Sequence, residues 1–195
     1  ADLAANKIIN ENLDPLGLLV LSEENKQIPY EERKHWNEFW LVDPLDGTKE
    51  FIKRNGEFTV NIALVTDNAP KLGVIYAPVP DTLYWGSEEG GSWKLEFASK
   101  NFNKEDITSG AQKLPSEGED KENLRIVASK SHFSKETEDF IHSLDTAGKE
   151  IKLVSRGSSL KLCMVAEGSA DIYPRLGPTM EWDTGAGHAI AKYEG

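Results

Sequence analysis

Cysteine is almost absent from this sequence, because Cys163 is the only one among 195 residues. A single thiol excludes an intramolecular disulfide and indicates a reducing environment. The neighbours of Cys163 are apolar, so we expect this thiol in the core rather than in the role of a nucleophile.

Long apolar runs and excess positive charge are also missing. No segment reaches the ~18 to 20 consecutive apolar residues of a membrane-spanning helix, and no secretory signal pattern opens the sequence. The 33 acidic and 22 basic residues give a net charge of −11, which disfavours binding to polymeric nucleic acid or to an anionic membrane. We therefore expect a soluble, cytoplasmic protein without a transmembrane segment; peripheral attachment at the inner membrane is the alternative in a bacterium.

The 38% of hydrophobic residues is enough to build a core, and the length suits one large domain or two small ones. Helical spacing of apolar residues predicts a helix at 2–13. The expected strands of the first half, which include an antiparallel pair and a hairpin, cover residues 16–21, 39–42, 58–65, 72–77, 83–85 and 92–95.

A polar, charged stretch without periodicity covers residues 98–123. It predicts three regions: an N-terminal α+β region for metal and phosphate at 1–100, a linker or loop at 101–123, and an α/β region for substrate recognition at 124–195. An extended loop inside one domain is the alternative. The last region alternates strands expected at 124–128, 151–154 and 170–173 with helices expected at 135–144 and 159–166.

Two carboxylates stand three residues apart at the end of the strand expected at 39–42. They are Asp43 and Asp46, followed by Gly47, which allows close backbone approach, and by the hydroxyl of Thr48. Hard oxygen ligands of this kind suit Mg²⁺ together with a phosphate. The alternative is an ordinary loop, because Asp, Pro and Gly are common turn residues.

Other acids also stand at element ends. Glu23 follows the strand expected at 16–21, and Asp183 begins a small-residue helical pattern at 181–190. Carboxylates that converge without a cation would repel one another, and a bound cation removes that cost. For each acid taken singly, a solvated surface position is the alternative.

The motifs carry a resemblance that covers nearly the whole chain outside the polar stretch. They are Ser22-Glu23-Glu24, Asp43-Pro44-Leu45-Asp46-Gly47-Thr48, the continuation to Ile62, Ser129-Lys130-Ser131-His132, Gly157-Ser158-Ser159-Leu160-Lys161, Val165-Ala166-Glu167-Gly168, Tyr173-Pro174-Arg175 and Trp182-Asp183. In these motifs the sequence resembles the inositol monophosphatase superfamily of Mg²⁺-dependent, lithium-sensitive phosphatases, and within it the CysQ-type 3'(2'),5'-bisphosphate nucleotidases.

The resemblance implies a layered αβαβα sandwich of the inositol monophosphatase and fructose-1,6-bisphosphatase type, here expected to be cut at both ends. It implies hydrolysis of the 3'-phosphate of 3'-phosphoadenosine 5'-phosphate to AMP and phosphate, in sulfate assimilation. Two or three Mg²⁺ ions would be held by Glu23, Asp43, Asp46, Asp183 and the backbone carbonyl of Leu45. Thr48 and Asp2 would activate the attacking water, with Glu23 as a further catalytic residue.

The substrate would be a small nucleotide bisphosphate, and the sequence does not predict an oligomeric state. By the resemblance, its scissile phosphate would lie at Gly47 and Thr48. Hydroxyl and basic groups of the second half suit the phosphate that is not hydrolysed; Lys161 is favoured because a helix N-terminus attracts anions, whereas His132 has the alternative of a helix-cap neighbour. The full set of expected substrate-binding residues is Leu45, Asp46, Gly47, Thr48, Ser129, His132, Ser158, Lys161, Arg175 and Asp183, with Ser131 as a further candidate.

Two other functions remain open from the sequence. One is an inositol or sugar monophosphatase of the same superfamily, although the Lys49-Glu50-Phe51-Ile52-Lys53 run after Thr48 favours the nucleotide. The other is a fragment that binds metal and nucleotide without catalysis.

Overall fold

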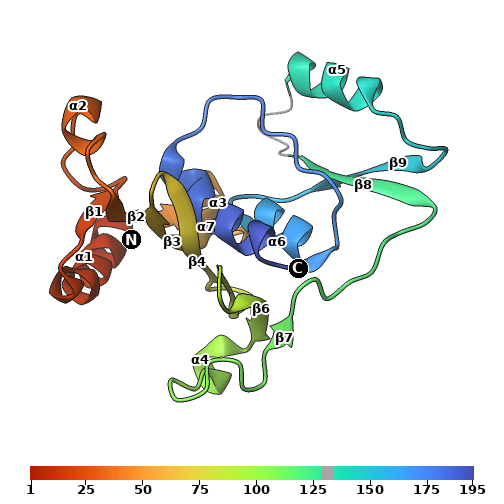
Figure 1. Cartoon of the computed structure of the whole chain (residues 1–195). Helices are drawn as coiled ribbons and strands as arrows, with labels where there is room; N and C mark the ends of the chain where they lie inside the picture. Colours follow the sequence, from red (N-terminus) through yellow and green to blue (C-terminus); the bar gives the residue numbers. More distant parts are fainter. Residues whose placement is uncertain (129–133) are drawn as a thin grey trace.

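The computed structural model describes residues 1–128 and 134–195. The expected positions Ser129, Ser131 and His132 lie outside the described residues. Five layers follow one another across the molecule in Figure 1: helix α1 (Asp2–Leu13), a seven-stranded sheet, helices α6 (Leu160–Glu167) and α7 (Glu181–Lys192), a two-stranded sheet, and helix α5 (Lys135–Ser143). The expected layered αβαβα arrangement is confirmed.

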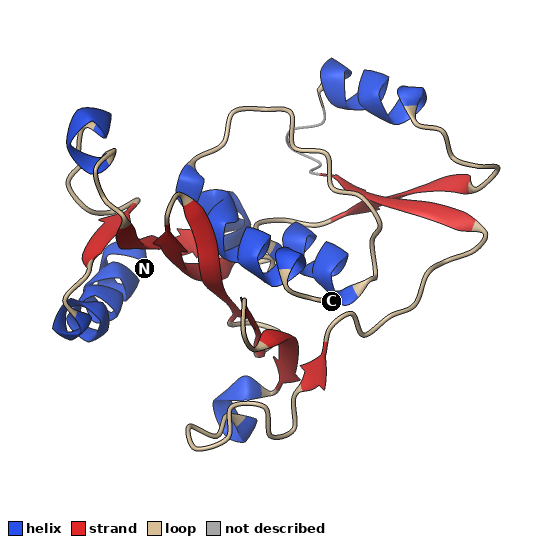
Figure 2. Ribbon diagram, viewed as in Figure 1, coloured by secondary structure: helices blue, strands red, loops and turns tan. Residues whose placement is uncertain are grey.

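The larger sheet follows chain order from its first strand to its last. Figure 2 draws the strands of both sheets as red arrows. Its first two strands are parallel, and every later neighbour is antiparallel, as the expected pair and hairpin require. The strands are β1 (Leu19–Ser22), β2 (Glu38–Asp46), β3 (Thr59–Thr66), β4 (Ala69–Ala77), β5 (Thr82–Ser87), β6 (Gly91–Glu96) and β7 (Gln112–Lys113).

The smaller sheet contains two parallel strands, β8 (Asn123–Ala128) and β9 (Glu150–Ser155). The prediction of a strand at 170–173 is wrong, because only an isolated bridge between Ile126 and Ile172 forms there. Pro174 follows immediately and has no backbone N–H to extend the ladder.

The expected helix at 2–13 is confirmed as α1, but the next strand begins three residues later than expected. A 3₁₀ turn, η1 (Asp14–Leu16), ends at Gly17 with a φ of 77°, so the chain becomes extended only at Leu19. The remaining short helices are α2 (Tyr30–Arg33), α3 (Thr48–Lys53) and α4 (Ala98–Asn101). Across the described ranges, every helix is too short or too polar to cross a lipid bilayer.

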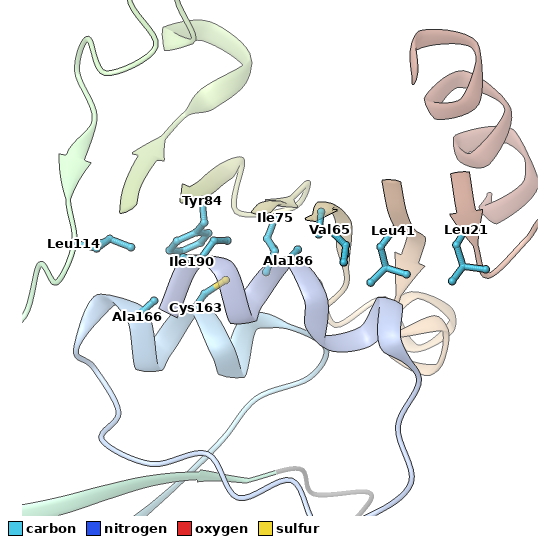
Figure 3. Packing of buried hydrophobic residues seen from close by; sticks show 11 residues of the cluster. Leu21, Leu41, Val65, Ile75, Tyr84, Leu114, Cys163, Ala166, Ala186 and Ile190 are labelled. Carbon is cyan, nitrogen blue, oxygen red and sulfur yellow. The ribbon is translucent and has the colours of Figure 1, made fainter. Parts of the chain in front are cut away.

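The main core lies between the seven-stranded sheet and helices α6 and α7. Figure 3 shows sheet residues such as Leu41 and Ile75 facing Ala186 and Ile190 of α7, while Cys163 comes from α6. Cys163 is buried, as expected. Because residues far apart in the sequence form this cluster, the C-terminal helix completes the core of the N-terminal sheet.

Glycines let α7 lie very close to the sheet. A Cβ added at Gly73 on β4 would stand 2.2 Å from the Ala186 carbonyl oxygen, and one at Gly86 on β5 would stand 2.8 Å from the Ile190 Cα. Such separations exclude any side chain at these two positions unless α7 moves. The close fit explains why α7 is rich in small residues.

The polar stretch at 98–123 is mostly exposed, although it contributes α4, β7 and the buried side chain of Leu114. Leu114 belongs to the main core cluster. The three-region division of the chain stays a prediction.

Candidate active site

A β-bulge in β2 brings two acids to one face of the sheet. Asp43 is paired with Asn61 and Asp46 with Thr59, so three steps on β2 match two steps on β3. Residues three apart on a regular strand point to opposite faces, and the extra residue of a bulge corrects this. The expectation that the strand stops at Val42 is therefore wrong, because β2 continues through the bulge to Asp46.

Asp43 is the most deeply buried of the expected ligands, with 2% of its surface exposed. Its Oδ1 accepts a hydrogen bond from the Leu45 N–H at 3.0 Å, and no ion pair with a basic side chain is found in the described part of the chain. Burial, together with the charges of Asp46 and Glu23, raises the pKa of Asp43 to about 9. The site therefore lacks a positive charge at this carboxylate.

Asp46 lies at the end of β2 and meets the N-terminus of α6. Its Oδ2 accepts from the Ser159 N–H at 2.5 Å and from the Ser159 hydroxyl at 2.7 Å. Burial raises the pKa of Asp46, although the Ser159 hydrogen bond and the Lys161 charge oppose that shift. All the protein hydrogen bonds found for this carboxylate within the described ranges go to Oδ2, which leaves Oδ1 for a ligand.

Asp183 is held in the same manner at the start of α7. Its Oδ2 accepts from the Thr179 hydroxyl at 2.8 Å and from the Met180 N–H at 3.0 Å, and the latter bond belongs to a capping box. Again only one carboxylate oxygen is engaged by donors from residues that the structure describes. The Arg175 guanidinium lies 4.0 Å from this oxygen.

Glu23 follows β1 and is tied to β2 by the hydrogen bond from its N–H to the Val42 carbonyl at 3.2 Å. Its side chain is largely exposed. Partial burial of the carboxylate raises its pKa, and the charges of Asp183, Glu24 and Asp46 act in the same direction, while a hydrogen bond with Asp43 opposes them. Five acids from three parts of the chain thus affect one another electrostatically.

The donor set fits Mg²⁺ in its chemistry, because it consists of carboxylate oxygens held near one another with raised pKa values. Outer hydrogen bonds on one oxygen of Asp46 and of Asp183 are typical of metal ligands. Over the described ranges, no three acidic, histidine or cysteine side chains are drawn together tightly enough to enclose an ion.

The turn after Asp46 is built around Gly47. Its φ of 94° lies in the left-handed region, and a Cβ there would stand 3.2 Å from the Ser158 Cβ and 3.1 Å from the Glu57 carbonyl oxygen. Thr48 follows as an exposed residue at the start of α3. Glycine at position 47 permits the loop that carries Ser158 to approach this turn closely.

Two basic side chains stand opposite the turn. Lys161 on α6 is 5% exposed, and its ammonium donates to the Ser158 carbonyl at 2.6 Å and stands 5.4 Å from the Tyr173 ring centre. Burial lowers the pKa of Lys161, while the charge of Asp46 raises it. Arg175 is partly exposed, and both basic side chains line the same cleft.

A cleft of about 290 Å³ joins these groups. Its lining includes the expected residues Asp46, Gly47, Thr48, Ser158, Lys161, Arg175 and Asp183. Glu23, Asp43 and Leu45 are not part of this lining. The cleft therefore brings together residues from the two halves of the sequence.

Asp2, the expected partner of Thr48, is not part of the cleft lining. It begins α1, which packs against β2, and its Oδ1 lies 3.9 Å from the amino group of Ala1. Neither a hydrogen bond nor an ion pair joins Asp2 to Thr48 within the described residues. Their pairing stays a prediction.

Sequence reasoning gave no role to Ser159 or to Asn61, although both contact Asp46. Asp46 belongs to the acid cluster, which we define as Glu23, Asp43, Asp46 and Asp183. Asn61 is 1% exposed on β3, and its amide donates to the Ser159 hydroxyl at 2.8 Å. A polar residue inside an otherwise apolar strand was the available signal for Asn61. Nothing in the sequence distinguishes Ser159 from the neighbouring Ser158.

Comparisons with known proteins identify the family of this chain. The family model described as "Inositol monophosphatase family" matches residues 1–195. A curated relative from Shigella flexneri, named 3'(2'),5'-bisphosphate nucleotidase CysQ, is 47% identical over 197 residues, covering 100% of this chain and 72% of the relative. The protein of the same name from Salmonella typhimurium is 48% identical over 193 residues, covering 98% and 71%.

Solved structures share the fold. The crystal structure of CysQ from Bacteroides thetaiotaomicron, titled a bacterial member of the inositol monophosphatase family, matches with a TM-score of 0.90 and 46% identity, covering 100% of this chain and 72% of that one. An inositol monophosphatase from Anabaena matches with a TM-score of 0.69 at 24% identity, covering 100% and 72%. The latter likeness concerns the fold alone.

Proposed function

Because this chain belongs to the inositol monophosphatase family, we propose that it is a Mg²⁺-dependent 3'(2'),5'-bisphosphate nucleotidase acting on 3'-phosphoadenosine 5'-phosphate. The observation that carries the proposal is the single cleft that holds Asp46, Asp183, the Gly47–Thr48 turn and two cations. Relatives nearly half identical over the whole chain carry that nucleotidase name. The proposed role of the enzyme is the turnover of this nucleotide during sulfate assimilation in the cytoplasm.

Glu23, Asp43, Asp46, Asp183 and the Leu45 carbonyl are the proposed ligands of two or three Mg²⁺ ions. When bound, Mg²⁺ supplies the positive charge that activates water and stabilises charge developing on the phosphate. Thr48 orients the water and accepts its proton, while Asp2 accepts the proton of the Thr48 hydroxyl. The carboxylate is needed because a threonine hydroxyl does not act as a base without such a partner. Oxygen from water joins the phosphorus, the bond to the 3'-oxygen breaks, that oxygen takes up a proton from a second water molecule, and AMP and phosphate leave.

Recognition of the nucleotide is proposed for the basic and hydroxyl side chains that line the same cleft as the acids. Lys161 and Arg175 supply charge for the 5'-phosphate, which is not hydrolysed, and Ser158 supplies a hydroxyl. Burial keeps Lys161 in place, so its ammonium needs little reorganisation on binding. Ser129 and His132 remain proposed partners from the sequence.

Phosphate release from 3'-phosphoadenosine 5'-phosphate tests the proposal when it is measured with Mg²⁺ and with a chelator. The Asp43→Asn variant removes a ligand charge while keeping the size of the buried side chain, and we expect it to lose more than about 100-fold in rate. Asp81→Asn is the matched control, since Asp81 also accepts several hydrogen bonds but lies outside the cleft. Full Mg²⁺-dependent activity in Asp43→Asn would contradict the assignment.

A further inference from the structure

Ser159 joins three elements of the acid cluster through one hydroxyl. Its Oγ lies 2.7 Å from Asp46 Oδ2 on β2, 2.8 Å from the Asn61 amide nitrogen on β3, and 3.1 Å from the Asp183 carbonyl oxygen on α7. The side chain is 3% exposed, so solvent does not compete for these contacts. Such a junction fixes the relative positions of the three elements.

The hydrogen-bond inventory of a hydroxyl decides the direction of each contact. The Asn61 amide must donate to Oγ, and the single hydroxyl hydrogen then has two acceptors. Asp46 Oδ2 is the nearer of them and carries charge, so the hydroxyl donates chiefly to Asp46. The Ser159 N–H adds a second donor to the same oxygen at 2.5 Å.

The position of Ser159 in its helix makes this use of the hydroxyl informative. Ser159 is the N-cap residue of α6, where serine ordinarily accepts a hydrogen bond from an N–H of the first turn. Its side chain makes no such bond. The hydroxyl is therefore directed at Asp46 instead of stabilising its own helix.

We propose that Ser159 is a positioning residue for the metal site: it holds Asp46 Oδ2, turns Oδ1 toward the ion, and links this carboxylate to the helix that carries Asp183. The inference rests on the proposed function, because it presumes that Asp46 is a metal ligand. Ser159 itself touches neither the reacting atoms nor the substrate in this role.

Mg²⁺ binding measured by isothermal titration calorimetry on the Ser159→Ala variant tests the inference without using activity. The variant keeps the backbone donor and loses the hydroxyl, so we expect a dissociation constant about tenfold higher or more. Ser159→Cys, which keeps an atom at the γ position but is a poor hydrogen-bond donor, carries the same test if the alanine variant does not fold.

Ser92→Ala is the matched control. Ser92 is also fully buried, and its hydroxyl donates to α7 as well, at the Ile190 carbonyl, 2.7 Å away and at the far end of the helix from Asp183. We expect Ser92→Ala to lower the melting temperature of the metal-free protein as Ser159→Ala does, but to leave the Mg²⁺ dissociation constant within twofold.

Three results would overturn the inference. An unchanged Mg²⁺ dissociation constant in Ser159→Ala, with normal binding and phosphate release in the unaltered protein, would remove the role of Ser159 alone. Equal weakening by Ser92→Ala would mean that loosening of α7 explains the effect. No Mg²⁺ binding by the unaltered protein would contradict the proposed function and the inference together.

Discussion

The Asp43 carboxyl is nearly inaccessible to water, and burial together with the charges of neighbouring acids raises its pKa from 3.8 to about 9. Between these values the folded, metal-free protein holds a proton that the unfolded chain has released. The free energy of unfolding of the metal-free protein therefore falls as pH rises from about 4 to about 9. Mg²⁺ binding must displace that proton, so the apparent Mg²⁺ affinity rises with pH over the same interval.

We predict that the increase in melting temperature caused by Mg²⁺ is larger at pH 8.5 than at pH 6, as measured by differential scanning calorimetry. Asp43→Asn should abolish most of this pH dependence and raise the melting temperature of the metal-free protein at pH 8.5. The rise is expected to be about 2–4 °C for each kcal/mol of relieved repulsion in a chain of this length. A Mg²⁺-induced increase that is the same at both pH values would contradict the prediction.

For individual residues, the sequence predicts much of the site, because acids at strand ends next to a glycine are typical of a metal or phosphate site. Asp46, Gly47 and Asp183 line the cleft as expected. Ser159 and Asn61 were not predicted, because their importance comes from contacts with residues 113 and 98 positions away, respectively. No local pattern encodes such contacts.

At the scale of elements, helix α7 depends on small residues on both sides of its interface with the sheet. A side chain at Gly73 would displace the helix that carries Asp183. The Gly73→Ala variant is predicted to lower the free energy of unfolding by about 1–3 kcal/mol through overpacking, as measured by urea denaturation. Gly118→Ala is the control, because its added Cβ has no neighbour within 4 Å, and a change within about 0.5 kcal/mol is expected there. Equal effects of the two would contradict the close packing.

The loop before α6 is held against the Gly47 turn by Glu57. The Glu57 carboxylate accepts from the Gly157 N–H at 2.9 Å and from the Arg156 guanidinium at 3.2 Å. This contact fixes the loop that carries Ser158 and precedes Lys161.

Glu57→Ala is predicted to raise the KM for 3'-phosphoadenosine 5'-phosphate about 5- to 10-fold, with a smaller effect on kcat, because a partly exposed charged hydrogen bond is lost. Steady-state kinetics measures both constants. Glu119→Ala breaks a comparable ion pair with Lys149 outside the cleft and should leave KM unchanged. An unaltered KM in Glu57→Ala would show that the loop does not need this anchor.

The strands of the larger sheet were predicted from alternation, but which face is better buried was not evident. On β3 the face with Thr59, Asn61 and Ala63 is fully buried, while the apolar Val60 and Ile62 are only partly buried. Tight contact with α7 explains this, because small side chains permit the closest approach. The bulge in β2 was missed for a related reason: only pairing with β3 reveals it.

At the scale of the whole molecule, the layers bring acids and cations together in one cleft. Asp46 comes from the first sheet, whereas Lys161 and Asp183 come from the helical layer that covers it. The order of most elements could be predicted from periodicity. Their convergence could not, since it depends on packing between segments that are more than 100 residues apart.

The most direct test of the account compares kcat/KM for 3'-phosphoadenosine 5'-phosphate and for inositol 1-phosphate under identical Mg²⁺ concentrations, with the nucleotide product identified. We predict at least about a 100-fold preference for the nucleotide, because two cations are available for its second phosphate. The product should be adenosine 5'-phosphate, and release should stop on Mg²⁺ removal and be inhibited by Li⁺. Equal or greater efficiency with inositol 1-phosphate, or release that persists without a divalent ion, would contradict the account.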